Sequence, residues 1–282
     1  MERELFYLYF IVCLFFFKQK TAYEMLRSLV GSEMCIRDRL YRMRPRLTPL
    51  GMPEYIEMMR AGGVSRGVVC GGSVEDNDHL MQVHEALGEA DPFYYIAGVH
   101  PKYGVRRNLE EIERCQRAGF LGVNVSPYIW GVPANASVLY PIYAHCEAHN
   151  LVAIVHGSLH YNRFQSMWLG DPKYMDEIAM NFPGLKLVIS HAGNGFGVLP
   201  LAVAQKHPNI FLEFSALWPQ YLPEATLRAV NSYLKDRCLF GTDYPLVEFD
   251  RAVEAWSEAV KPEVRELFFS ANAERCLFGE PR

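Results

Sequence analysis

The sequence predicts an α/β protein, a (β/α)8 TIM barrel that is N-terminally truncated so that its first strand is missing. From residue 40 onward, short apolar segments rich in β-branched and aromatic residues alternate with amphipathic segments of helical periodicity. Consecutive strand ends are 24 to 35 residues apart, close to the roughly 30 residues of a strand with its crossover helix. The continuous apolar character of the strands indicates a parallel sheet that is covered on both faces.

Seven strands and nine helices account for this alternation. The strands are expected at 66–70, 93–99, 121–126, 151–156, 185–191, 210–215 and 237–243. The helices are expected at 52–61, 74–87, 109–118, 138–149, 173–181, 199–207 and 224–234, with a C-terminal pair at 251–260 and 262–270. The helix at 52–61 precedes the first strand, as the first helix of a barrel would after loss of strand 1. An open doubly wound sheet is the alternative, although no G-x-G-x-x-G motif follows a strand.

The N-terminal residues do not fit this pattern. The apolar run at 5–17 is too short to span a membrane, and the acidic residues before it do not suit a signal peptide. The segments 18–24 and 28–38 resemble the conceptual translation of a sequencing-library adapter, with residues 25–27 as its index tag. We therefore expect residues 1–39 to be an adapter-derived artefact and residues 40–282 to form one domain. An amphipathic N-terminal helix is the alternative.

Composition restricts the class of partner. The 282 residues are 50% hydrophobic and 21% charged, with a net charge of −4. This slight acidity gives no reason to expect nucleic acid or a membrane surface as a partner. The seven cysteines are scattered and form no C-x-x-C motif, which indicates reduced thiols and a cytoplasmic protein.

Three ionisable residues end predicted strands: His156, His191 and Asp243. In a barrel the carboxyl ends of the strands carry the chemistry. A single histidine after a buried strand is more often structural, but three such residues on three of the last four strands indicate a shared site. Neutral imidazoles and a carboxylate bind zinc, manganese or iron, and a water bound to such an ion loses its proton near neutral pH.

The residue types leave several roles open. Asp243 can ligate the ion and also take a proton from the attacking water, and His191 can bind metal or act as a general acid or base. A serine nucleophile is disfavoured because the chain has no G-x-S-x-G elbow. Cys70 and Cys238 lie at or within strands, where buried thiols are usually inert.

Residues in the loops after the strands supply a candidate substrate lining. They are His100, Lys102, Tyr128, Trp130, His160, Arg163, Asn194 and Trp218. Aromatic rings with a few cations suit a small planar or cyclic carboxylated substrate, and Lys102 and Arg163 are the preferred anion binders. For each of these residues a solvated or packed loop side chain is the alternative. Glu213 lies within a strand and is either a carboxylate that supports the site or a structural one.

Three motifs resemble a known family: LVAIVHG, the run FPGLKLVISHAGNGFGVLPLAVAQKHPNIFLEFSA, and LFGTDYP. Residues 48–277 resemble the amidohydrolase-related (amidohydrolase 2) family typified by aminocarboxymuconate semialdehyde decarboxylase and related lactonases. The resemblance implies a TIM barrel with an H-x-H or E-x-H pair on strand 1. By motif position it implies that His156 and Asp243 are metal ligands, and that His191 positions or deprotonates the catalytic water. No such pair lies between residues 40 and 52, and we attribute its absence to truncation.

Three functions from different classes follow. The first is metal-dependent hydrolysis of a small carboxylated cyclic ester, lactone or amide through an activated water. The second is non-oxidative decarboxylation of an aromatic or unsaturated acid at the same site. The third is a non-catalytic barrel that binds a ligand. We expect a divalent metal ion, zinc first with manganese or iron as alternatives, and a small-molecule substrate. The sequence leaves open whether the protein is a monomer or a homodimer.

Overall fold

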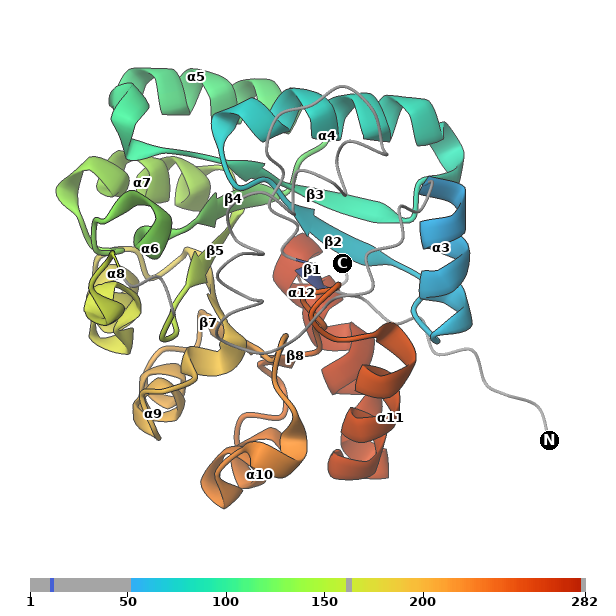
Figure 1. Cartoon of the computed structure of the whole chain (residues 1–282). Coiled ribbons are helices and arrows are strands. Elements are labelled where there is room, and N and C mark those ends of the chain that lie inside the picture. The colour runs from blue at the N-terminus through green and yellow to red at the C-terminus, as the bar shows by residue number, and fades with distance from the viewer. Residues whose placement is uncertain (1–10, 13–51, 161–163, 280–282) are drawn as a thin grey trace.

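The computed structural model describes residues 11–12, 52–160 and 164–279. Its strands are β1 (Ile11–Val12), β2 (Gly67–Cys70), β3 (Phe93–Gly98), β4 (Gly122–Val125), β5 (Val152–His156), β6 (Lys186–Ser190), β7 (Ile210–Glu213) and β8 (Cys238–Leu239). They form one parallel sheet in the order β1-β2-β3-β4-β5-β6-β7-β8. The sheet curls, and helices lie between its successive strands (Figure 1). This is the TIM-barrel-like α/β fold that the sequence predicts.

The α-helices occupy the connections between strands and the C-terminal end. They are α3 (Met52–Ala61), α4 (Val74–Leu87), α5 (Gly104–Arg117), α6 (Pro127–Trp130), α7 (Tyr140–Ala148), α8 (Pro172–Asn181), α9 (Leu199–Lys206), α10 (Glu224–Val230), α11 (Phe249–Ala259) and α12 (Asn272–Phe278). Short 3₁₀ turns join several of them. The last expected helix, at 262–270, is instead a 3₁₀ turn (Pro262–Val264) and a π-helical segment (Leu267–Ala271) that leads into α12.

Strand β8 is shorter than the expected strand at 237–243. The backbone N–H of Phe240 donates to the carbonyl oxygen of Phe268, 3.0 Å away, instead of to a neighbouring strand. Asp243 then adopts a φ of 56°, which no strand residue has. At Phe240 a hydrogen bond to the C-terminal segment therefore stands where one to a neighbouring strand would be, while bonds from Phe214 to Leu239 and from Ala216 to Thr242 continue on the β7 side.

The edge of the sheet beside β2 carries the two-residue strand β1. Ile11 pairs with Val68 and Val12 with Val69, at the place where the sequence analysis expected the first strand to be missing. The adapter-like segments at 18–24 and 28–38 lie outside the described residues.

Strand side chains alternate between two apolar layers. One layer packs against the surrounding helices, for example through Val69, Ala97, Val123, Val155 and Ile189. The other includes Val68, Cys70, Ile96, Ile154 and Val188, together with Ala273, Cys276 and Leu277 of α12. Helix α12 meets the sheet at the strand starts, where Nζ of Lys186 donates to the carbonyl of Leu277 at 3.0 Å. Burial on both faces explains the continuous apolar strands, and the carboxyl ends of the strands stay clear of α12.

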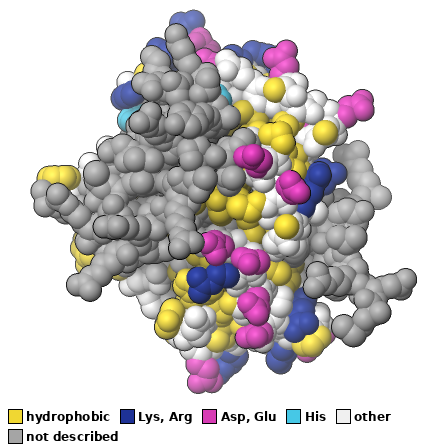
Figure 2. Space-filling view, turned by 45° about the vertical axis from the view of Figure 1, so that its right-hand side comes forward, with side chains coloured by type: hydrophobic (Ala, Val, Ile, Leu, Met, Phe, Trp, Pro, Cys, Tyr) yellow, Lys and Arg dark blue, Asp and Glu magenta, His cyan; other side chains and the backbone are white. Residues whose placement is uncertain are grey.

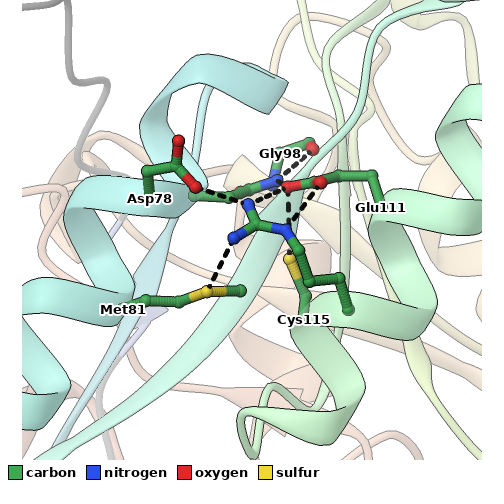
Figure 3. A network of polar contacts seen from close by, with 7 residues as sticks. Asp78, Met81, Gly98, Glu111 and Cys115 are labelled. Atoms are coloured by element: carbon green, nitrogen blue, oxygen red, sulfur yellow. Dashed lines mark hydrogen bonds and ion pairs between the residues drawn. The ribbon is translucent and has the colours of Figure 1, made fainter.

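Buried Asn77 joins α4 to β3 and α5, in the polar network that includes Gly98 and Glu111 (Figure 3). Nδ2 of Asn77 donates to the carbonyl of Gly98 at 3.0 Å, and Oδ1 accepts from the N–H of Gly98 at 2.7 Å. Nδ2 also donates to Glu111 at 2.9 Å, and Glu111 pairs in turn with Arg114 at 2.7 Å. A side chain at Gly98 would overlap the backbone of Ser73. This close approach fixes the end of β3 and the start of α4.

The outer surface mixes charges of both signs. On the face shown in Figure 2, acidic and basic side chains are interspersed, with apolar atoms between them. Among the described residues, no helix is both long enough and apolar enough to cross a bilayer.

Replacing Asn77 with alanine should lower the free energy of unfolding by about 3 kcal/mol, because both backbone groups of Gly98 lose their partner in a buried place. Chemical denaturation measures this change. Asn181→Ala is the matched control, because the exposed side chain of Asn181 donates to the carbonyl of Glu177 in the same helix and its loss should change stability by no more than about 0.5 kcal/mol. Equal losses in the two variants would contradict the role given to Asn77.

Candidate functional site

Two of the predicted site residues meet at the carboxyl ends of β5 and β6. His156 is the last residue of β5 and pairs in register with Ser190, the last residue of β6. His191 follows Ser190 directly. The parallel register therefore places the two imidazoles beside each other, with their ring centres 4.9 Å apart and the rings edge to face.

The imidazole of His156 is held in its neutral form. Its Nδ1 is buried and has no hydrogen-bond partner among the described residues. The ring of Tyr128 lies against it, with 4.4 Å between ring centres. Burial lowers the pKa of His156 well below its usual value, and the nearby rings of His191 and His160 lower it further. A neutral imidazole with an unpartnered nitrogen is the form of histidine that binds a metal ion.

His191 is held in a strained turn by β7 and the residues after it. Its φ is 56°, and that of Ala192 is 48°, a region that costs free energy for residues other than glycine. The backbone N–H of His191 donates to Oε2 of Glu213 at 3.3 Å. Nδ1 lies 3.1 Å from the carbonyl oxygen of Ser215. Because a carbonyl can only accept, Nδ1 of neutral His191 carries the proton and Nε2 is left with a lone pair.

Glu213, for which the sequence left open a supporting or a purely structural role, contacts this group. It is fully buried at the end of β7, and Ser215 donates to it twice, from the backbone N–H at 2.5 Å and from Oγ at 2.8 Å. Burial raises the pKa of Glu213 to about 7, against the lowering effect of His191 and Ser215. A charged residue type inside an apolar strand was the only signal in the sequence, and its partners depend on the register of β6 and β7.

Asp243 lies buried in the turn after β8. Its backbone φ is 56°, and its carbonyl accepts from the N–H of Leu246 at 2.8 Å. The side chain is 5% exposed.

His156 and Asp243 carry the kinds of donor atom that a divalent metal ion binds. His156 supplies a neutral imidazole with an orphaned buried nitrogen, and Asp243 supplies a buried carboxylate, so the chemistry of both suits a divalent cation. Among the residues that the structure describes, however, no three His, Cys, Asp or Glu side chains come close enough to hold one. The donor atoms of His156 and Asp243 are of the type that a divalent metal ion binds, but a complete site needs ligands in addition to these two residues.

Tyr128 and His160 extend the group around His156. The rings of Tyr128 and His160 stack with 5.2 Å between their centres. Nε2 of His160 lies 2.8 Å from the carbonyl oxygen of Ser166. The two rings therefore form a packed stack beside His156.

A second group of predicted lining residues gathers after β3. The ring of His100 lies 5.6 Å from that of Trp130, and its Nδ1 accepts from the backbone N–H of Lys102 at 3.2 Å. Nζ of Lys102 is paired with Glu75 at 3.7 Å and lies over the ring of Tyr103. The proposed anion binder therefore already has a carboxylate partner.

The remaining predicted lining residues are more scattered. Asn194 is exposed, and its carbonyl accepts from the N–H of Leu159 at 3.0 Å. The ring of Trp218 is covered by the guanidinium of Arg251 at 5.3 Å. Arg163 lies outside the described residues.

The cysteines of the described region are buried free thiols: Cys70, Cys115, Cys146, Cys238 and Cys276. Burial raises the pKa of Cys238 well above its usual value. The thiolate needed for nucleophilic attack is therefore disfavoured at this strand.

The sequence and the fold of this chain are similar to those of known proteins. A family model described as "Amidohydrolase" matches residues 39–279. An uncharacterized TIM-barrel protein from Bordetella bronchiseptica is 25% identical, with a TM-score of 0.79 over 96% of this chain and 98% of that chain. A 5-carboxyvanillate decarboxylase from Sphingomonas paucimobilis is 16% identical, with a TM-score of 0.70 over 96% and 99% of the two chains.

A second 5-carboxyvanillate decarboxylase, from Novosphingobium aromaticivorans, was solved with manganese and 4-hydroxy-3-methoxy-5-nitrobenzoic acid. It is 16% identical, with a TM-score of 0.72 over 97% of each chain. At this level of identity the two decarboxylases share the fold with this chain.

The lowered pKa of His156 predicts an acid-sensitive fold. Below about pH 6.5 the imidazole of His156 binds a proton in the unfolded chain but stays neutral in the folded protein. The stability of the fold is therefore unaffected by this residue above that pH, and it decreases as the pH falls toward the pKa of His156 in the folded protein. Urea unfolding in the presence of a chelator measures the free energy of unfolding at each pH. As the pH falls below about 6.5, this free energy should decrease less steeply in His156→Asn than in the wild type, by up to about 1.4 kcal/mol per pH unit. Exposed His149 gives the control His149→Asn, which should follow the wild type. Equal slopes for all three proteins would contradict the burial argument.

Proposed function

Because this chain belongs to the amidohydrolase family, we propose that it is a metal-dependent hydrolase of a small carboxylated cyclic ester, lactone or amide. The observation that carries this proposal is the fixing of His191 beside His156. With Nδ1 turned to the carbonyl of Ser215 at 3.1 Å, the lone pair of Nε2 is left to act on a water. A base held in this way suits the activation of a nucleophilic water.

His156 and Asp243 are the residues that would hold the metal ion, together with ligands beyond the described residues. We propose zinc, with manganese and iron as alternatives; the Novosphingobium relative was solved with manganese. When bound, a divalent cation polarises the substrate carbonyl and makes a water more acidic.

Proton transfer in this reaction is assigned to His191 and Asp243. Nε2 of His191 takes a proton from the water as its oxygen bonds to the carbonyl carbon. The imidazolium is stabilised by the carbonyl oxygen and hydroxyl of Ser215, 3.1 and 3.0 Å from Nδ1. His191 returns the proton to the leaving oxygen or nitrogen as the C–O or C–N bond breaks. Asp243 is the second group placed to accept a proton.

Substrate recognition is proposed for the loops after β3, β4 and β5. The stacked rings of Tyr128 and His160 form an apolar wall of the kind that suits a planar or cyclic substrate. Lys102 would reach a substrate carboxylate by exchanging its partner Glu75, which is an exposed pair at 3.7 Å and is therefore easily broken. Arg163 is the other proposed anion binder.

Non-oxidative decarboxylation of an aromatic acid is the second candidate. The observation in its favour is that similar solved structures include a 2,6-dihydroxybenzoate decarboxylase and a 5-carboxyvanillate decarboxylase. The same residues would serve, but His191 or Asp243 would deliver a proton to the substrate carbon that loses the carboxylate.

The experiment offers the metal-supplemented protein a panel of lactones, cyclic amides and hydroxybenzoates, and measures acid release and carbon dioxide separately. Acid release from a lactone or amide without carbon dioxide is the expected result, and carbon dioxide from a hydroxybenzoate would favour the second candidate. In either case His191→Asn should lower kcat about 10²- to 10⁴-fold. His149→Asn, which alters an exposed histidine, should leave kcat unchanged. Near-normal turnover by His191→Asn would reject the assigned role.

A further inference from the structure

A buried chain of polar groups runs from Glu213 through Ser215 to His191. We propose that Glu213 is a positioning residue that acts through the Ser215 hydroxyl to hold His191 as the tautomer with its proton on Nδ1. The proposal rests on the function assigned to His191 above. It gives Glu213 of β7 and Ser215 of the following loop a role in catalysis that is exerted through His191.

The direction of each hydrogen bond follows from the acceptors available. The hydroxyl of Ser215 donates to Oε2 of Glu213 at 2.8 Å. Its one proton is therefore used, and toward Nδ1 of His191, 3.0 Å away, the hydroxyl oxygen must accept. The carbonyl of Ser215 also accepts at 3.1 Å. Both acceptors require the proton on Nδ1, so the two contacts specify one tautomer together.

Glu213 is what gives the hydroxyl its direction. Without an acceptor on that side, the Ser215 hydroxyl is free to turn and donate to Nδ1, which favours the other tautomer. The carboxyl group also accepts from the backbone N–H of His191 at 3.3 Å, and so it contacts the strained turn that carries the ring. One carboxyl group thus orients both the ring nitrogen and the backbone of the same residue.

The space for this carboxyl group comes from the motif that contains Asp243. A side chain at Gly241 would overlap Oε1 of Glu213, so the glycine of LFGTDYP leaves room for a buried acid. A buried carboxyl group is costly to the fold, and buried acids beside a candidate base are a feature of functional sites. The LFGTDYP motif and β7 are therefore joined at a single contact.

Asp76 provides a matched comparison. It is a buried carboxyl group, 4% exposed, that likewise accepts three hydrogen bonds, from the N–H groups of Gly72 and Ser73 and from the hydroxyl of Ser73. Burial raises its pKa to about 7, as for Glu213. It belongs to the cap of α4 and has no contact with His191 in the described structure. Asp76→Asn therefore tests what the loss of a buried carboxylate does by itself.

The experiment reads the tautomer of His191 directly from the nitrogen-15 chemical shifts of its ring, at about pH 8, where an ordinary imidazole is neutral. The full chain should show the proton on Nδ1. Glu213→Gln, whose amide N–H can donate to the Ser215 hydroxyl and so leave that hydroxyl to donate to Nδ1, should shift His191 toward a mixture of tautomers. Ser215→Ala, which keeps the carbonyl acceptor of Nδ1, should hold the proton on Nδ1 even when it is combined with Glu213→Gln. Ser215→Thr, which keeps the hydroxyl, and Asp76→Asn should not shift the tautomer either. An unchanged tautomer in Glu213→Gln, or an equal shift in the Glu213→Gln and Ser215→Ala double variant, would overturn the proposal.

Kinetics supply the second readout. We expect kcat to fall about 10- to 100-fold in Glu213→Gln and in Ser215→Ala, with KM within about twofold, because orientation of the base and not substrate binding is lost. The double variant should be little slower than either single variant, since both act through one hydroxyl. Multiplicative losses would show that Glu213 acts independently and would contradict the proposal.

The two readouts separate this inference from the proposed function. The tautomer is measured without substrate, so a shifted tautomer in a protein that turns over no ester, amide or hydroxybenzoate would reject the function and keep the positioning role. Activity that is lost in His191→Asn but unchanged when the tautomer of His191 shifts would keep the proposed function and reject the positioning role of Glu213. If Glu213→Gln does not fold, the kcat of Ser215→Ala compared with that of Ser215→Thr tests the hydroxyl: equal values would contradict its role in orienting His191.

Discussion

The parallel alignment of the strands is the constraint on which the site depends. In a parallel sheet all carboxyl ends meet at one edge, so residues far apart in the chain come together only if each stands just after its strand. His156 ends β5, His191 follows β6, and Glu213 ends β7. The pairing of His156 with Ser190 then determines which ring meets which. A shift of one residue in this register would turn His191 to the other face of the sheet.

The fold also has to compensate the polar groups that it buries near this edge. The side chain of Asn77 forms hydrogen bonds with the N–H and the carbonyl of Gly98, and the carboxyl group of Glu213 accepts hydrogen bonds from Ser215 and His191. In both places a glycine makes the approach possible, because a side chain at Gly98 or at Gly241 would overlap its neighbours. The first arrangement holds the fold together, and the second orients the candidate base.

Hydrophobic patterning was sufficient to predict seven of the strands, because strands buried on both faces are apolar throughout. The juxtaposition of His156 and His191 could be expected from their place after those strands. Contacts that depend on register or on loop conformation could not. The pairing of Lys102 with Glu75 and the chain from Glu213 to His191 join residues whose spacing in the sequence has no periodic signature. The hydrogen bond from Phe240 to the C-terminal segment is another contact of this kind.

If the ends of β5, β6 and β8 form one metal-dependent site, a metal ion should bind there in a crystal. X-ray diffraction from crystals soaked in manganese or zinc, with data collected at the absorption edge of the metal, locates the ion. We expect one strong anomalous peak within bonding distance of a ring nitrogen of His156 and the carboxylate of Asp243, with His191 beside it. A peak elsewhere on the chain, with none near His156, would contradict this expectation.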